Sequence, residues 1–409
     1  MKIPKKILMV SFHFPPIAES SGYLRAFKFS KFLPQYNIIP TVLTIRPKAY
    51  TAMDKNNYLL LNQLSKDVSI SRAYGFDNSK TFSFKGKYLG LFTIPDRWSS
   101  WIPFAIFKGW KLHKKNTFDG IWATYPISSS LIIGWVLASL LKKPLYIDLR
   151  DPVWEEETWQ GTLKQKALKW LEFKVISKAK NVIFTSPGTI KKYKERYERY
   201  LQSKFVLIAN GFDEDDFQNL PQIIKPKKAL FLHSGLLPKY ERDPAHFFQA
   251  IAELKQESLL NSSEVVFRLR ATGENNKYKQ LVSNLGIDDL VEIAEQKEYK
   301  YAISEMFTAD VLMVFQHRTC DWQTPAKLFE YFRVGKPLLL LTGSNSDTLK
   351  LAKRSGSQYC TSEIDNVNEI KQAIASCLTN KETPLNTDNY SRYSRKEGAK
   401  SLALLIKEN

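Results

Sequence analysis

The segment QTPAKLFEYFRVGKPLLLL, residues 323–341, combines a helix start with charged side chains that could bind an anion. Thr324 followed by a proline predicts a helix with a hydroxyl N-cap, and Gly335 predicts its end. Lys327 then lies in the first turn, where the helix dipole disfavours a cation. Glu330 comes three residues later and therefore lies on nearly the same helix face.

Two interpretations of Lys327 and Glu330 stand at this point. They could form an ordinary surface ion pair. Alternatively, an anion such as a diphosphate binds at the helix N-terminus to backbone N–H groups and Lys327, while Glu330 accepts hydrogen bonds from an attached ribose. The second interpretation places the anion at the carboxyl end of the apolar run 310–316, where open parallel sheets bind their ligands.

Turn motifs follow several other apolar runs. HSGLLPKYERDP places Gly235 and Arg242 directly before a predicted helix, and RATGEN places Gly273 at the end of another run. A glycine after a strand is usually only a turn, so neither motif identifies a site by itself. The acidic run DEDD, residues 213–216, lies on a loop between the two halves of the chain, and we do not expect it to bind a metal.

In the first half of the chain, DLRD ends an apolar run and places Arg150 and Asp151 at a strand end. These two residues fit acceptor binding or catalytic assistance about as well as a structural ion pair. His13 follows the first apolar run, and His233 precedes Gly235. Either histidine could line a cleft, although a single histidine at a strand end is more often a hydrogen-bonded structural group.

Elements must position these side chains, and the chain alternates β-rich apolar runs with helix-length segments. In the first half we predict strands over residues 6–14, 41–45, 120–125, 144–150, 181–186 and 205–213. After a Pro/Lys linker at 221–228, we predict strands over residues 229–235, 265–273, 291–295, 310–316 and 337–343. Continuous apolar runs separated by helices are typical of parallel strands covered on both faces.

The predicted fold class is therefore α/β, with two Rossmann-like, doubly wound domains that face an interdomain cleft. We place the first domain at residues 1–212 and the second at residues 213–387. The last segment, 388–409, predicts a helix that packs back on the first domain.

Composition narrows the class of protein. With 409 residues, of which 44% are apolar and 25% charged, the chain is typical of a globular protein with two or three domains. Three cysteines without a CxxC pair argue against a disulfide framework or a zinc site and favour a reducing compartment. The N-terminus lacks a signal-peptide pattern, and the run ISSSLIIGWVLASLL is too short for a membrane span, so it predicts a buried helix. We expect a cytoplasmic protein.

A formal net charge of +19 requires an explanation. The segment Lys80–Lys115 carries eight basic residues against one acid, Asp96, with interleaved aromatic residues that include Trp98, Trp101 and Trp110. Aromatic rings beside lysines suit an anionic membrane surface, and the same combination of side chains could bind nucleic acid. The alternative is that the rings pack in the core and the lysines are simply solvated.

Taken in order, the motifs FPP…GYLRAFKFSKFL, DLRDPVW, TSPGTI, IANGFD, SGLLPKYERDP and TPAKLFEYFRVGKP resemble the retaining family 4 glycosyltransferases of the two-Rossmann (GT-B) fold. The resemblance spans nearly the whole chain and is greatest to bacterial enzymes of surface-polysaccharide assembly. It implies transfer of a sugar from a nucleotide donor on the second domain to a glycan or polyprenyl-linked acceptor on the first. It also implies a UDP- or GDP-linked co-substrate, no cofactor, no essential metal, no nucleic acid partner, and a cytoplasmic location peripheral to the inner face of the membrane.

The resemblance also assigns residues. Glu330 matches the glutamate that contacts the ribose, Arg242 the basic residue that holds the diphosphate, and Lys327 the lysine of the motif TPxKxFEY. Gly22 matches a glycine that faces the donor phosphates, and the backbone near Glu295 and Gln296 lies close to the base. We predict a catalytic set of Arg242, Lys327 and Asp151, a donor-binding set of Gly22, Gly235, Arg242, Gly273, Glu295, Thr324, Lys327 and Glu330, and an acceptor-binding set of His13, Arg150 and Asp151.

One position departs from the family pattern. Where the family commonly has a glutamate eight residues before Glu330, this chain has Trp322. Its neighbours Asp321 or Gln323 could substitute, or the sugar is recognised differently, as for a deoxy or N-acetylated hexose. Two other functions stay open. One is a nucleotide-sugar 2-epimerase of the same fold, which would need acid–base carboxylates that the sequence does not show, and the other is a non-catalytic basic binding protein.

Overall fold

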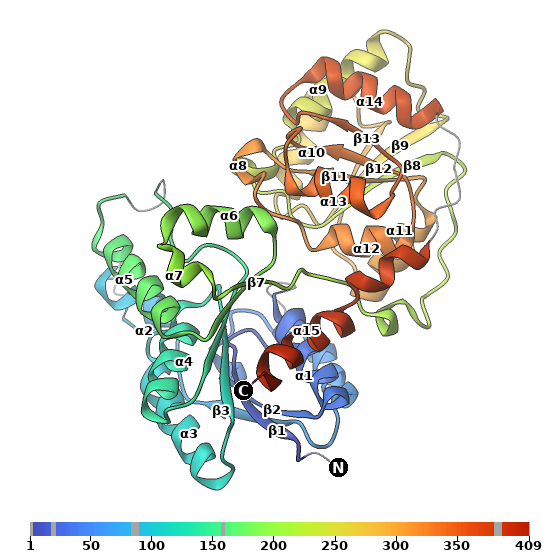
Figure 1. The fold of residues 1–409 in the computed structure, drawn as a ribbon. Helices are drawn as coiled ribbons and strands as arrows, with labels where there is room; N and C mark the ends of the chain where they lie inside the picture. Colours follow the sequence, from blue (N-terminus) through green and yellow to red (C-terminus); the bar gives the residue numbers. More distant parts are fainter. Residues whose placement is uncertain (1–2, 18–21, 83–89, 157–159, 380–386, 409) are drawn as a thin grey trace. The chain divides into compact units, whose positions relative to one another are not determined.

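The computed structural model describes residues 3–17, 22–82, 90–156, 160–379 and 387–408. The chain forms two compact units: unit 1 is Met1–Asn210 with Arg395–Asn409, and unit 2 is Gly211–Ser394. Each unit contains one parallel sheet with helices packed on it (Figure 1). The predicted α/β class with two Rossmann-like units is confirmed.

Unit 1 is built on a seven-stranded sheet of order β3-β2-β1-β4-β5-β6-β7. Its strands are β1 (Lys5–Val10), β2 (Ile38–Ile45), β3 (Ser69–Ala73), β4 (Gly120–Thr124), β5 (Leu145–Leu149), β6 (Asn181–Phe184) and β7 (Phe205–Leu207). Its helices are α1 (Tyr23–Phe32), α2 (Asn78–Thr81), α3 (Trp101–Lys115), α4 (Ser128–Leu140), α5 (Leu163–Lys178), α6 (Pro187–Arg196), α7 (Arg199–Gln202) and α15 (Arg395–Lys407). One core lies between the sheet and α3, α4 and α5, and a second lies between the sheet and α1 and α15. β4 and β5 are buried along their whole length because both faces are covered.

Unit 2 is built on a six-stranded sheet of order β10-β9-β8-β11-β12-β13. Its strands are β8 (Ala229–Ser234), β9 (Val265–Arg270), β10 (Val291–Ala294), β11 (Val311–Phe315), β12 (Leu338–Leu341) and β13 (Tyr359–Ser362). Its helices are α8 (Lys239–Arg242), α9 (Ala245–Gln256), α10 (Asn275–Asn284), α11 (Tyr299–Thr308), α12 (Lys327–Val334), α13 (Asp347–Ser355) and α14 (Val367–Thr379). A core of this unit lies between the sheet and α9, α10 and α14.

Several boundaries differ from the prediction, and two of them have a clear cause. The first strand ends at Val10 rather than at residue 14, because the chain leaves the sheet and the Tyr50 hydroxyl lies 2.9 Å from the carbonyl oxygen of Phe12. Unit 2 continues to Ser394 rather than to residue 387, because the Tyr390 ring stacks on Phe332 of α12. The chain then returns to unit 1 as α15, which packs against α1.

Candidate functional site

The helix that carries Lys327 begins later than predicted. α12 starts at Lys327, Ala326 occupies the N-cap position, and no side chain caps the helix, so the prediction of Thr324 as the N-cap is wrong. The preceding segment stays outside the helix, where the carbonyl of Gln323 accepts a hydrogen bond from the Gln316 side chain at 3.1 Å. Gly335 is the C-cap, as predicted, and it is left-handed with a φ of 74°. Lys327 is therefore the first residue of the helix.

Lys327 contacts a neutral histidine at the end of β8. Its Nζ lies 3.0 Å from Nε2 of His233. Nδ1 of His233 lies 2.9 Å from the carbonyl oxygen of Met313, and Nε2 also lies 3.1 Å from the carbonyl oxygen of Gly235. A neutral imidazole has one N–H, so with the ammonium of Lys327 at Nε2 it donates from Nδ1 to Met313 and presents the lone pair of Nε2 to the lysine. Burial and then the charge of Lys327 lower the pKa of His233 well below its ordinary value. The hydrogen-bond partner of Lys327 is thus an uncharged group.

Gly235 leaves the space that the Lys327 ammonium occupies. Its φ is 124°, a conformation that side chains strain, and a Cβ added there would lie 2.8 Å from Lys327 Nζ. The Gly235 N–H donates to the carbonyl of Arg270 at 2.9 Å, which fixes the turn against β9. The predicted donor-binding glycine and the predicted catalytic lysine therefore lie in contact.

Arg242 lies close to the same two side chains. Its positive charge lowers the pKa of both Lys327 and His233. The short helix α8 that carries it is tied to the loop after β11, because the N–H of His317 donates to the carbonyl of Glu241 at 2.7 Å. Within the described part of the chain, the Arg242 side chain makes no hydrogen bond and no ion pair.

The charge at this edge of the unit 2 sheet is therefore unbalanced. Burial and then Arg242 lower the pKa of Lys327 well below its ordinary value, and Glu330 opposes that shift only in part. Glu330 is 9% exposed, and its Oε1 accepts a hydrogen bond from the Tyr299 hydroxyl at 2.6 Å. Two adjacent cations that lack a carboxylate ion pair among the described residues are suited to binding an anion such as a diphosphate.

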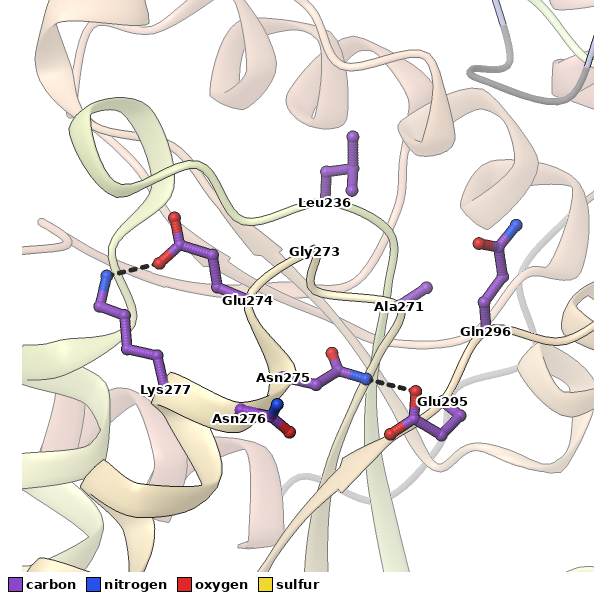
Figure 2. A pocket seen from close by; sticks show the side chains of 9 residues that line it. All are labelled: Leu236, Ala271, Gly273, Glu274, Asn275, Asn276, Lys277, Glu295 and Gln296. Carbon is purple, nitrogen blue, oxygen red and sulfur yellow. Dashed lines mark hydrogen bonds and ion pairs between the residues drawn. The ribbon is translucent and has the colours of Figure 1, made fainter. Parts of the chain in front are cut away.

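A cavity of about 590 Å³ lies at the carboxyl ends of β8, β9 and β10, and Figure 2 shows the side chains around it. Its lining consists of Leu236, Ala271, Gly273, Glu274, Asn275, Asn276, Lys277, Glu295 and Gln296. Leu236 directly follows Gly235, which contacts Lys327, so the cavity begins next to the two cations Arg242 and Lys327. Its volume is within the range of small-molecule sites.

Two predicted residues, Gly273 and Glu295, line this cavity. Glu295 accepts a hydrogen bond from the Asn275 amide at 2.9 Å, as Figure 2 shows, and its backbone carbonyl accepts one from Arg270 at 2.6 Å. Sequence reasoning missed Ala271, which has a φ of 58° although it is not a glycine. Residues with a strained backbone cluster at functional sites, but the sequence RATGEN does not indicate that its alanine has a positive φ.

Unit 1 gathers its predicted residues at the carboxyl edge of its own sheet. Arg150 donates from Nε to the carbonyl of Tyr125 at 2.8 Å and from Nη1 to the carbonyl of Gly22 at 2.7 Å. Burial and then the charge of Arg150 lower the pKa of His13 to about 3, so its imidazole is neutral at pH 7. Asp151 is exposed. Arg150 is thus used to join loops, while Asp151 faces solvent.

Sequence reasoning missed a buried ion pair beneath these residues. Arg25 of α1 is 4% exposed and binds the carboxylate of Asp148 through two nitrogens, each at 2.8 Å. It also donates to the carbonyls of Ile208 at 2.8 Å and Ala209 at 3.1 Å. The signal was present as a single arginine in the apolar helix GYLRAFKF.

A second buried carboxylate fixes the loop that carries Asp151. Glu172 of α5 accepts hydrogen bonds from the hydroxyls of Tyr193 at 2.5 Å and Tyr197 at 2.6 Å and from the N–H of Val153 at 3.3 Å. The position of Asp151 therefore depends on groups that no motif contained.

The structure shows contacts of Asp321, one of the two substitutes proposed for the missing glutamate, and of Trp322 at the glutamate's own position. The Asp321 carboxylate lies against Gly343 and accepts a hydrogen bond from its backbone, so it is engaged within the protein. Burial and then Glu363 raise the pKa of Asp321. The Trp322 indole donates to the carbonyl of Thr319 at 2.9 Å.

Among the described residues, no group of three or more His, Cys, Asp or Glu side chains is placed to hold a metal ion. In the acidic run DEDD, Asp213 accepts from the N–H of Asp215 at 3.1 Å, and Glu214 pairs with Arg333 at 2.8 Å. These acids have structural partners.

Comparison with known proteins gives the fold. No protein-family model and no curated protein matches the chain. The chain is similar to sucrose-phosphate synthase from Thermosynechococcus elongatus, with 14% identity and a TM-score of 0.69 over 99% of this chain and 98% of that chain. It is similar to HepE of Anabaena in complex with UDP-glucose, with 16% identity and a TM-score of 0.68 over 99% and 100%. It is also similar to a UDP-N-acetylglucosamine 2-epimerase, with 11% identity and a TM-score of 0.56 over 100% and 95%. At this identity the likeness shows the GT-B fold and leaves the activity to the site.

Proposed function

We propose that the protein is a glycosyltransferase that moves a sugar from a nucleotide-sugar donor to a glycan or polyprenyl-linked acceptor. The observation that carries the proposal is the pair of cations Arg242 and Lys327, which makes no ion pair with a carboxylate in the described residues. The shared fold with HepE, whose structure contains UDP-glucose, supports it further. The sequence motifs suggest retaining family 4 and surface-polysaccharide synthesis in the cytoplasm.

The donor is assigned to unit 2. The diphosphate binds Arg242 and Lys327 beside Gly235, with Thr324 next to the helix start. Glu330, already bonded to Tyr299, accepts from the ribose hydroxyls. The uracil or guanine nucleoside occupies the cavity bounded by Gly273 and Glu295.

The chemistry follows from the charge. The bond between the sugar C1 and the phosphate oxygen breaks, and its electron pair passes to the diphosphate. Arg242 and Lys327 stabilise this developing charge more in the transition state than in the ground state. The acceptor hydroxyl oxygen bonds to C1 on the same face, and its proton passes to the departing phosphate oxygen. This route retains the anomeric configuration and needs neither a separate base nor a metal.

The acceptor is assigned to unit 1, at the edge that carries His13, Arg150 and Asp151. Because Arg150 already donates to two backbone carbonyls, we assign it to positioning this edge. Asp151, which is exposed, takes the contact with acceptor hydroxyls.

A 2-epimerase is the second candidate, because the fold is also that of a UDP-N-acetylglucosamine 2-epimerase. That reaction needs acid–base carboxylates around the sugar ring. Near the cations, Glu330 is bonded to Tyr299, and Asp321 lies against Gly343. These engagements favour the transferase.

The test is a donor panel of UDP-, GDP- and ADP-sugars with and without polyprenyl-linked acceptors, followed by NMR of the products. A transferase releases nucleoside diphosphate and forms a glycoside with the donor's anomeric configuration. A product epimerised at C2 without nucleotide release would identify the epimerase instead. If no donor is consumed and none shifts the melting temperature, the proposal fails.

A further inference from the structure

The outer helical layer of unit 1 is apolar and basic at once. Figure 1 shows α3, α4 and α5 along one side of this unit, and α4 packs against both neighbours. We call this layer the α3–α5 face. Its exposed large apolar side chains are Phe104, Phe107, Trp110, Leu140, Leu163, Trp170 and Phe173. Single exposed apolar residues are ordinary, whereas seven on three adjacent helices, with the Phe107 ring stacked on Trp110, indicate an interaction surface.

The middle helix of the face has no charged residue. The sequence predicted a buried helix for α4, and its inner side is buried, but Leu140 is 61% exposed. The half-buried Trp135 meets Trp170 of α5 edge to face, with ring centroids 5.7 Å apart. A surface helix normally has a polar outer side, so an apolar outer side indicates that something covers it.

Lysines flank this apolar centre. α3 carries four lysines and α5 carries five, while the single acid of the three helices, Glu172, is fully buried. Lys111 lies 4.4 Å from the Phe107 ring centroid and Lys114 lies 3.9 Å from that of Trp110. Neither lysine forms an ion pair with the described part of the chain.

We propose that the α3–α5 face binds the surface of an anionic lipid bilayer. Rings at the headgroup boundary and lysines against anionic headgroups are the combination that interfacial binding requires. No helix among the described residues combines the length and apolarity needed to traverse a bilayer, so the helices would lie along its surface. The combination of lysines and aromatic rings favours a bilayer as the partner, because a bilayer supplies negative headgroups to the lysines and hydrocarbon to the rings.

The structure changes the sequence prediction for Lys80–Lys115. Trp98 and Trp101 are 8% and 0% exposed and pack in the core, so they cannot reach a membrane. Trp110 does lie on the surface. The prediction did not include α5, which contributes the exposed side chains of Trp170 and Phe173. Residues 83–89 of the segment lie outside the described part of the chain.

The test is flotation of the full chain with vesicles of phosphatidylcholine alone or with about one third phosphatidylglycerol. We expect binding only to the anionic vesicles, weakened by salt. The charge variant Lys111→Glu/Lys114→Glu and the ring variant Phe107→Ser/Trp170→Ser should each reduce binding about tenfold or more.

Matched controls lie on unit 2. Lys353→Glu/Arg354→Glu reverses two exposed charges, and Ile224→Ser removes a side chain that is 94% exposed. Both should bind vesicles like the wild type. Equal binding by all variants would overturn the proposal. A second pattern would also overturn the proposal: the charge variant loses vesicle binding, the ring variant keeps it, and a single-stranded oligonucleotide competes with the vesicles for the protein. That pattern describes a nucleic acid site. Turnover of a water-soluble donor is a separate readout, so failure here leaves the proposed function untouched.

Discussion

The two sheets use positive charge at their carboxyl edges in opposite ways. In unit 1, Arg25 is bound by the Asp148 carboxylate and two backbone carbonyls, and Arg150 donates to two more carbonyls. In unit 2, Lys327 donates to a neutral imidazole, and the side chain of Arg242 has no hydrogen-bond partner among the described residues. The cations of unit 1 therefore hold the fold together, while those of unit 2 are available to a ligand. Position at a strand end does not distinguish the two roles, whereas the partners of each side chain do.

The largest expected effect is on stability in unit 1. Arg25→Met leaves the Asp148 carboxylate buried without its partner, so the free energy of unfolding should fall by about 3–5 kcal/mol. Urea denaturation followed by circular dichroism measures it. The double variant Arg25→Met/Asp148→Leu should recover part of the loss, and a single variant as stable as the wild type would remove the structural role from this arginine.

The same substitution in unit 2 should act on turnover and not on stability. Lys327→Met removes a charged hydrogen bond to the diphosphate, so kcat/KM should fall by the equivalent of about 1.5–3 kcal/mol. Because the pKa of Lys327 is lowered in the folded chain, the unfolded chain binds the lysine proton more tightly. The cation therefore destabilises the fold below its ordinary pKa, and the variant should be at least as stable at pH 7. A less stable variant with normal turnover would make Lys327 a structural residue like Arg25.

Gly235→Ala tests the contact between the turn and the lysine. Both its φ of 124° and the closeness of Lys327 Nζ disfavour a Cβ, so stability should fall by about 1–2 kcal/mol and donor affinity should fall as well. Gly356→Ala is the matched control, because its φ is 76° and nothing lies within 4 Å of the added Cβ. Both variants should lose stability, but only Gly235→Ala should lose donor affinity. Equal affinity in the two would separate Gly235 from the site.

A smaller effect should appear in the pH dependence of donor binding. Only protonated Lys327 attracts the diphosphate, so affinity should decline as the pH rises through the lowered pKa of that lysine, by at most about 1.4 kcal/mol per pH unit. A nucleotide sugar suits the measurement, since its diphosphate has no terminal group that titrates near pH 6. Calorimetry in two buffers should show proton uptake on binding. The Lys327→Met variant should show neither effect, and a wild type without them would mean that Lys327 does not touch the donor.

The sequence predicted the central strands because their apolar runs reflect burial on both faces. It missed β3 (SISRA) and β13 (YCTS), which are both edge strands and are only partly buried. For the site, the motifs placed Arg150 and Arg242 equally well after strands. Only the fold shows that the side chain of Arg150 donates to carbonyls of distant residues, whereas the side chain of Arg242 has no hydrogen-bond partner in the described chain. The neutral state of His233 likewise depends on its burial and on the charge of Lys327, and no local motif shows either of them.

The most direct test of the cation pair is calorimetric titration of UDP- and GDP-sugars into the wild type, Arg242→Met and Lys327→Met, with Lys353→Met as the charge-matched control. We predict saturable binding of at least one donor by the wild type and the control. Each site variant should bind it at least about tenfold more weakly. Binding of the same strength in all four proteins would contradict the account, and so would a wild type that binds no donor.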